Sequence, residues 1–110
     1  MEIRNIPFNV FNWKSAEASE HKGDTGTSFW RAIESGGIRV RTVQYTPGFR
    51  SDHYCPRGHV LLVLQGEVGI HLRDGRTFSL GEGSGFVAGD DEANPHSVVS
   101  ERGATVFIVD

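Results

Sequence analysis

The chain has 110 residues, of which 23% are charged and 37% hydrophobic, and its formal net charge is −3 at pH 7. This length suits one domain around one core, so we expect residues 1–110 to form a single domain. The arginines are scattered along an acidic chain, so no nucleic-acid partner is expected. The sequence lacks a signal-peptide pattern and a membrane-length apolar run, which predicts a cytoplasmic protein without membrane contact.

Residues 1–14 are rich in apolar side chains but are interrupted by Pro7. Because proline cannot donate a backbone hydrogen bond within a sheet, this segment predicts an edge strand or an N-terminal arm. The polar segment 15–27 predicts a loop. Strands are expected over 28–35 and 38–46, joined as a hairpin by two glycines that accept positive φ. Along 38–46 neither alternate set is purely apolar, so its inward face cannot be assigned from the sequence.

The second half of the chain continues as short strands. Residues 60–64 are a continuous apolar run, which predicts a strand buried on both faces. Asp74-Gly75 is a hairpin signal between two further strands. The expected strands in this half cover residues 60–64, 67–73, 76–80, 86–88, 95–100 and 104–109. About nine or ten short strands without a helical apolar period predict an all-β sandwich or barrel.

The stretch 48–66 joins the candidate chemistry to the apolar core. If residues 51–55 are extended, His53 and Cys55 point to the same side, because strand side chains two apart share a face roughly 6 to 7 Å apart. The turn residues that follow allow the chain to fold back and present His59 to the same point. Cys55 is the only cysteine, so it is a thiol, a metal ligand or an intermolecular cross-link.

This spacing resembles the first motif of the cupin superfamily, in which a glycine precedes His-x-His, a Glu and a second glycine. In this sequence Gly48 leads, His53 and Cys55 take the two His positions, and His59 takes the Glu position before Gly66. The order Asp-His-Tyr-Cys here also resembles a small cupin subgroup named for an Asp-His-Cys-Trp signature.

The second cupin motif is similar to residues 83–89 followed by Pro95-His96, although its Pro-x-Gly is missing. The resemblance covers about residues 38–109. It implies a jelly-roll β-barrel of about nine or ten strands, and a homodimer in which the N-terminal strand packs across the interface. The ligand set that it implies for one metal ion is His53, Cys55, His59 and His96.

The residue types of this set determine which metal is expected. Thiolate with imidazoles favours zinc, with Fe, Ni, Cu, Co or Mn as alternatives. Four protein ligands would fill a tetrahedral zinc, and closed sites are usually structural, so catalysis requires a higher coordination number or one ligand that stays off. In the alternative without metal, Cys55 is a small buried apolar residue and the histidines are hydrogen-bonded wall residues.

Three further residues are candidates for a pocket. His71 lies on an alternating strand and would serve as a general base if it faced the lumen, although a surface or wall histidine is more common. Tyr54, between two ligands, is expected on the opposite face as a core or interface aromatic. Arg41, with Arg39, would bind a carboxylate if this strand face pointed inward. His21 is expected to be solvated, or to belong to a lid.

Three functions follow from these residues and from the resemblance. The first is a metal-binding cupin that acts on or binds a small polar molecule; as an enzyme it would be a metal-dependent oxygenase or isomerase. The second is a non-catalytic ligand-binding or sensing module with a structural metal. The third is a metal-free, sugar-epimerase-like cupin with His53 or His96 as a base. The fold itself does not distinguish them.

Overall fold

The structure is a computed structural model that describes residues 2–57, 60–89 and 94–110. These residues form ten strands and one short 3-10 helix, η1 (Trp13–Ser15). The strands are β1 (Ser19–Lys22), β2 (Thr27–Ser35), β3 (Ile38–Tyr45), β4 (Phe49–Arg50), β5 (Val60–Gly66), β6 (Val68–Leu72), β7 (Thr77–Leu80), β8 (Gly85–Val87), β9 (His96–Ser100) and β10 (Ala104–Val109).

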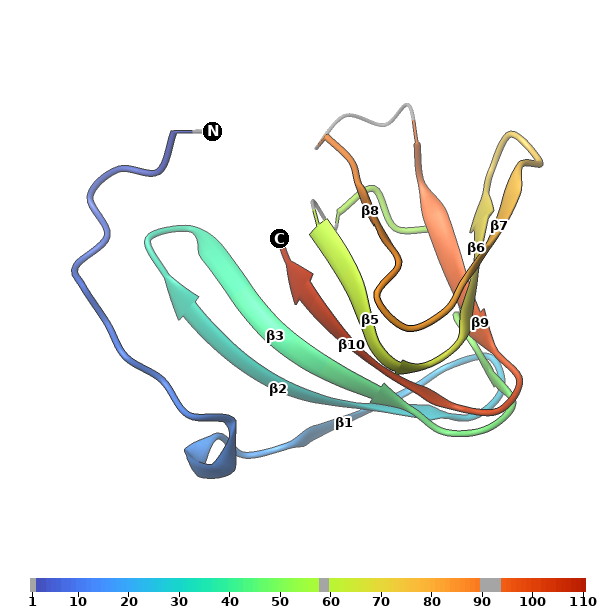
Figure 1. Ribbon diagram of the computed structural model, residues 1–110, viewed down its shortest axis with the longest axis horizontal. Coiled ribbons are helices and arrows are strands. Elements are labelled where there is room, and N and C mark those ends of the chain that lie inside the picture. Colours follow the sequence, from blue (N-terminus) through green and yellow to red (C-terminus); the bar gives the residue numbers. More distant parts are fainter. Residues whose placement is uncertain (1, 58–59, 90–93) are drawn as a thin grey trace.

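The strands form two antiparallel sheets (Figure 1). The six-stranded sheet has the order β1-β2-β3-β10-β5-β8, and the four-stranded sheet has the order β4-β9-β6-β7. Apolar side chains from both sheets fill the space between them, which confirms the predicted all-β jelly roll. The buried apolar residues of this core are Val43, Phe49, Leu61, Val63, Val68, Ile70, Val98, Ala104, Val106 and Ile108.

The hairpin predicted in the first half of the chain is present. β2 and β3 pair from Ser28↔Tyr45 to Ser35↔Ile38, and the two residues between them, Gly36 and Gly37, have φ values of 57° and 84°. Only glycine adopts these values without steric cost, which explains the tight connection.

The structure also shows which face of β3 points inward. Arg41 and Val43 are buried, with 9% and 1% of their surface exposed, and they alternate with Gln44, which is exposed. Two arginines of this strand therefore face the four-stranded sheet and bring charge into the interior of the molecule.

The expectation that β5 is buried on both faces is wrong. Leu61 and Val63 are buried, whereas Leu62 and Leu64 are 37% and 49% exposed. In the part of the chain that the structure describes, the four-stranded sheet covers only one face of the six-stranded sheet, so alternate residues of β5 reach its outer face.

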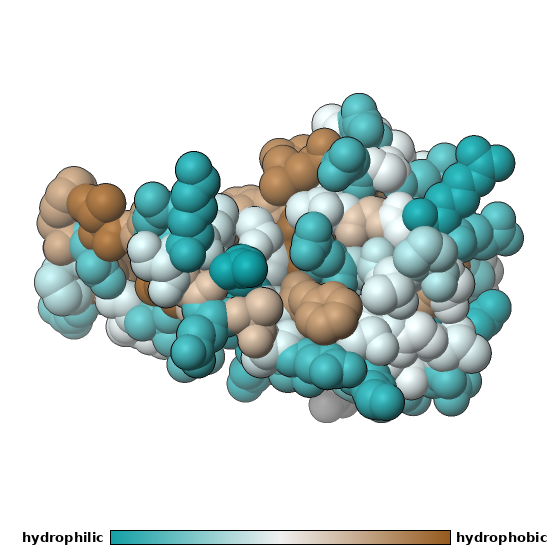
Figure 2. Space-filling view, turned by 90° about the horizontal axis from the view of Figure 1, so that it is seen from below, coloured by the Kyte–Doolittle hydropathy of each residue, from teal (hydrophilic) through white to brown (hydrophobic). Residues whose placement is uncertain are grey.

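The N-terminal segment is an arm. Residues 2–12 contain no strand, and the segment predicted as a loop after residue 14 contains β1. Phe8 and Val10 on the arm are 97% and 78% exposed. The arm lies at the left in Figure 1, and Figure 2 shows hydrophobic, brown atoms at that same end. No described helix has the length and apolar character needed to cross a bilayer.

Candidate functional site

A cavity of about 340 Å³ lies between the two sheets. It is lined by side chains from both sheets and from the segment that follows β4. Two groups of its lining residues carry the candidate chemistry. One, here called the Arg–Trp wall, consists of Trp30, Arg39 and Arg41 on β2 and β3. The other, here called the donor set, consists of His53, Cys55 and His96.

Cys55 and His96 lie directly opposite each other. They form an isolated antiparallel bridge in which Cys55 N donates to the His96 carbonyl at 2.8 Å and His96 N donates to the Cys55 carbonyl at 3.0 Å. Residues paired in this way point their side chains to the same face. One sulfur and one imidazole, far apart in the sequence, are thus adjacent at the cavity.

The surroundings of His96 suit a ligand-binding imidazole. The side chain is buried, its ring meets Phe86 edge-on at 5.0 Å, and Nδ1 lies 3.3 Å from the carbonyl oxygen of Asn94. A proton on Nδ1 satisfies this contact and leaves the lone pair on Nε2 as the acceptor. A backbone carbonyl commonly fixes the tautomer of metal-binding histidines in this way.

His53 is placed differently from the expectation for an extended strand. The chain bends at Asp52 and His53, between Ser51 and Cys55, whose backbones hydrogen-bond to β9. The imidazole Nδ1 lies 2.5 Å from Asp52 Oδ1, and 72% of the His53 side chain is exposed. The hydrogen bond from His53 lowers the pKa of Asp52. His53 lines the same cavity as the other two donors, but as an exposed residue.

His59, the fourth predicted ligand, lies outside the described residues. Among those that are described, no three His, Cys, Asp or Glu side chains converge closely enough to hold a metal ion. The donor types suit a soft divalent ion, and two of them, Cys55 and His96, are adjacent. The complete four-ligand site remains a prediction.

The Arg–Trp wall is ordered by the carboxylate of Asp110, the residue that follows β10. Arg39 donates from Nε to Asp110 Oδ1 at 2.9 Å and from Nη2 to Oδ2 at 2.7 Å, while Arg41 Nη2 donates to the same Oδ2 at 3.0 Å. The Arg41 guanidinium lies 4.2 Å from the centroid of the Trp30 ring, within cation–π range. One carboxylate therefore holds two guanidinium groups beside an indole.

Charge and burial shift the pKa values of this group. Burial of Asp110 acts to raise its pKa, but the Arg39 hydrogen bond and the two arginine charges outweigh it, so the pKa is lowered. Burial lowers the pKa of Arg41. The pKa of Arg39 is raised, first by its hydrogen bond to Asp110, and the charge of Cys55 contributes in the same direction. The charges of the Arg–Trp wall and of Cys55 are therefore close enough to act on one another.

Two more cavity residues remain neutral near pH 7. His21 on β1 stacks on Trp30 at 3.7 Å between ring centroids, and burial and the two arginine charges lower its pKa. Burial raises the pKa of Tyr45 to about 12, so its phenol keeps its proton and can donate a hydrogen bond. Trp30 is held in turn by Ser28, whose hydroxyl accepts from the indole Nε1 at 3.0 Å.

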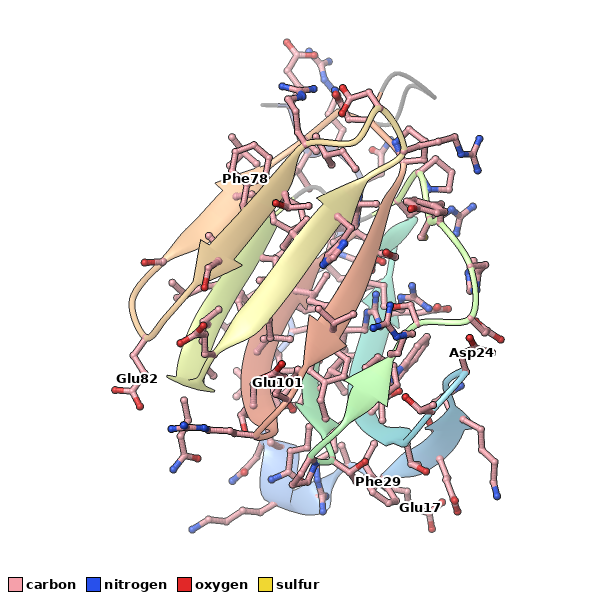
Figure 3. The ribbon with its side chains drawn as sticks, turned by 90° about the vertical axis from the view of Figure 1, so that its right-hand side faces the viewer. Glu17, Asp24, Phe29, Phe78, Glu82 and Glu101 are labelled. Carbon is pink, nitrogen blue, oxygen red and sulfur yellow. The ribbon has the colours of Figure 1, made fainter. Side chains whose placement is uncertain are left out.

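Two of the candidate pocket residues do not line the cavity. His71 alternates with the buried Ile70, and a methyl group at Gly69 would lie 3.7 Å from its Nε2 and 2.9 Å from Val99, so His71 lies on the outer face of the four-stranded sheet. Figure 3 views this sheet from outside, with Phe78 at its edge. Tyr54 is 40% exposed, under the Arg73 guanidinium.

Sequence reasoning missed three residues that build the wall. Trp30 and Asp110 were not singled out, and His21 was expected to be solvated. The sequence carried no signal for Asp110, because only the strand pairing in the structure places the residue after Val109 beside Arg39.

No protein-family model matches the sequence, and no curated protein matches it significantly. Solved structures do match. An RmlC-like cupin from Shewanella frigidimarina has a TM-score of 0.70 and 16% identity, with coverage of 94% of this chain and 90% of the other. This chain has the RmlC-like cupin fold.

Other solved structures support this assignment of the fold. A predicted oxalate decarboxylase from Thermotoga maritima has a TM-score of 0.74 and 14% identity, with coverage of 92% and 96% of the two chains. A polyketide cyclase from Streptomyces resistomycificus has a TM-score of 0.69 and 18% identity, covering 93% and 78%. At these identities the likeness establishes the fold, and the Asp-His-Cys-Trp subgroup remains a prediction.

Proposed function

We propose that this cupin binds one divalent transition metal at the donor set and acts on or binds a small polar molecule in the adjoining cavity. The observation that carries the proposal is the pairing of Cys55 with His96 across one β-bridge at the cavity. A thiolate and an imidazole held side by side favour zinc over harder ions.

His53 and His59 would complete the metal site. His53 already lines the cavity, and its Nδ1 contact with Asp52 leaves Nε2 as the donor atom. A carboxylate that orients a ligating imidazole is a common arrangement outside the metal's own ligands. A bound divalent ion would supply Lewis-acid or oxygen-binding chemistry.

The other cavity residues have separate roles in this proposal. Arg41 and Tyr45 present donors to a polar group of the ligand, and Trp30 and Phe49 exclude water from its apolar part. Structures of this fold include proteins named as a predicted oxalate decarboxylase and a polyketide cyclase, which supports a role on small organic molecules. An oxygenase or an isomerase is the enzyme class that we favour.

A second function is favoured by a different observation. Because no three donors converge among the described side chains, a metal-free cupin that uses His96 as a base, or that only binds its ligand, accounts for the same cavity. Metal content distinguishes the two functions, since the metal-free cupin needs none.

The test is metal analysis of protein purified without a polyhistidine tag. About one equivalent of zinc or another transition metal is expected, and Cys55→Ser and His96→Asn should each lower it well below one. His71→Asn is the matched control, because His71 does not line the cavity, and it should retain the wild-type content. A wild-type protein that holds almost no metal after incubation with zinc would favour the metal-free function.

We also propose a homodimer. The outer face of the six-stranded sheet exposes Phe29, Leu62 and Leu64, and the N-terminal arm exposes Phe8 and Val10. Exposed apolar groups of this size commonly mark an interface between subunits. Light scattering after size exclusion should give twice the chain mass, and a monomer at micromolar concentration would contradict the proposal.

A further inference from the structure

Two guanidinium groups of the Arg–Trp wall are hydrogen-bonded to one carboxylate. Arg39 and Arg41 share a single carboxylate, that of Asp110, which already receives two hydrogen bonds from Arg39. His21, the titratable side chain stacked on Trp30, is held neutral by its lowered pKa and adds no charge near pH 7. Glu34, paired with Arg39 across the hairpin, and Cys55 act on Arg39 as well, whereas Asp110 is the one described carboxylate that acts on Arg41. Arg41 is therefore the less compensated of the two charges at the cavity.

Arg41 also has a donor without an acceptor. Arg41 is only 9% exposed, and its Nε is buried without a hydrogen-bond partner in the part of the chain that the structure describes. Leaving a charged donor unpaired in the interior costs more than leaving a neutral one. Arg41 lines the cavity, so a small shift of its side chain would bring this Nε to an acceptor on a bound molecule.

The rest of the cavity has the same sign of charge. The whole chain has a formal net charge of −3, but the charged residues lining this cavity are mainly basic. The described lining residues of fixed charge are Lys22, Arg39, Arg41 and Arg57, which are positive, and Asp52, which is negative. A cleft lined by one sign of charge concentrates ions of the opposite sign, so an anion is favoured.

Apolar lining limits what kind of anion fits. Trp30, Phe49, Phe86 and Leu61 contribute aromatic and aliphatic surface, and a volume of about 340 Å³ is at the low end for small-molecule sites. A small ligand with an apolar part and one anionic group matches this combination of surface, volume and charge.

We infer that Arg41 binds the carboxylate of a small, partly apolar organic monoacid in this cavity. This inference extends the proposed function. It rests on that function for the position of the ligand beside the donor set. It does not require the metal for recognition. A guanidinium matches the planar carboxylate, and the single guanidinium of Arg41 matches a monoanion better than an inorganic phosphate dianion.

The first test compares ligands on the unaltered protein. Calorimetric titrations at pH 7.5 use benzoate, phenylacetate and acetate, with the neutral benzamide and inorganic phosphate as controls. At least one of the two aromatic acids should bind, and benzamide should bind roughly 10- to 100-fold more weakly than benzoate because it cannot pair with the guanidinium. Acetate should bind more weakly than the aromatic acids, because it buries little apolar surface.

The second test changes Arg41. Arg41→Met keeps an apolar stem and leaves Asp110 with its two Arg39 hydrogen bonds, so the fold should be retained. It should weaken the aromatic acid roughly 10- to 100-fold. Arg41→Lys keeps the charge without Nε and should give an intermediate loss. Arg76→Met is the matched control, because Arg76 lies outside this cavity, and it should bind normally.

Both titrations are run on chelator-treated and zinc-loaded protein. Binding that persists without metal, in a protein that takes up no zinc, supports the acid site and contradicts the metal proposal. Zinc uptake without binding of any of the three acids below about 1 mM overturns the acid site alone. Equal binding of benzoate and benzamide, binding of phosphate as tightly as benzoate, or an unchanged affinity in Arg41→Met would also overturn it.

Discussion

The Arg–Trp wall and the donor set line the same cavity, but they are held in different ways. The wall stands on β2 and β3, two long paired strands, and is tied to Asp110 by three hydrogen bonds. Of the donor set, Cys55 is tied to β9 by one bridge and His53 lies in an exposed bend. The wall is therefore preorganised, and so is His96 of the donor set, whereas the exposed segment that carries His53 can adjust when a metal or ligand arrives.

The largest effect should come from removing the carboxylate that orders the wall. Asp110→Asn leaves two guanidinium groups without their counter-ion, and the Asp110 side chain is only 2% exposed. Removing one partner of a largely buried ion pair should lower the free energy of unfolding by about 3 kcal/mol. Chemical denaturation measures this change.

A matched control for this prediction is Asp74→Asn. Asp74 pairs with Arg76 at 2.8 Å, but both side chains are about half exposed. Solvent screens such a pair, so the denaturation midpoint should hardly move. Equal shifts for the two variants would contradict the view that burial of the pair makes the wall rigid.

A smaller effect should come from the support of Trp30. The buried Ser28 hydroxyl accepts from Trp30 Nε1 at 3.0 Å and donates to the His21 carbonyl at 3.3 Å. Ser28→Ala removes both hydrogen bonds and should lower the free energy of unfolding by about 1 kcal/mol. Ser28→Thr, which restores a hydroxyl, should recover part of this loss. No loss in Ser28→Ala would mean that the indole is held by stacking alone.

The next effect depends on pH and concerns His21. Because burial in the folded protein holds the pKa of His21 below its ordinary value of 6.5, the unfolded chain binds more protons. Stability should therefore fall as the pH drops through about 6.5, and the loss ends below the folded pKa. His21→Gln should reduce this slope between pH 7.5 and 5.5, measured by denaturation, and an unchanged slope would contradict the prediction.

The smallest effect on stability should occur at the donor set. Asp52 and His53 are both exposed, so Asp52→Asn should leave the free energy of unfolding nearly unchanged. If Asp52 orients His53 as a ligand, the same variant should nevertheless have a roughly 10-fold lower affinity for zinc, measured by competition with a chelator. A large loss of stability without a change in zinc affinity would reverse the roles assigned to the wall and the donor set.

Sequence patterns predicted the fold better than the site. Glycine pairs and apolar periodicity fixed the hairpins and most strand positions, because both reflect local backbone and burial preferences. The inward face of residues 38–46 could not be assigned from the sequence, because its arginines pair with Asp110, which lies about 70 residues later, just after β10. The motif grouped His53, Cys55 and His96, and these three residues do line one cavity. The bend at His53 was not predicted, because residues 51–55 were taken to be extended.

The position of Trp30 gives the molecule an intrinsic optical reporter. The chain has two tryptophans, Trp30 beside Arg41 in the cavity and Trp13 in η1, next to Phe11. A Trp13→Phe protein would therefore emit from the cavity alone. Occupation of that space, displacement of His21 or protonation of its ring would each alter this emission, so fluorescence could follow events at the site in real time.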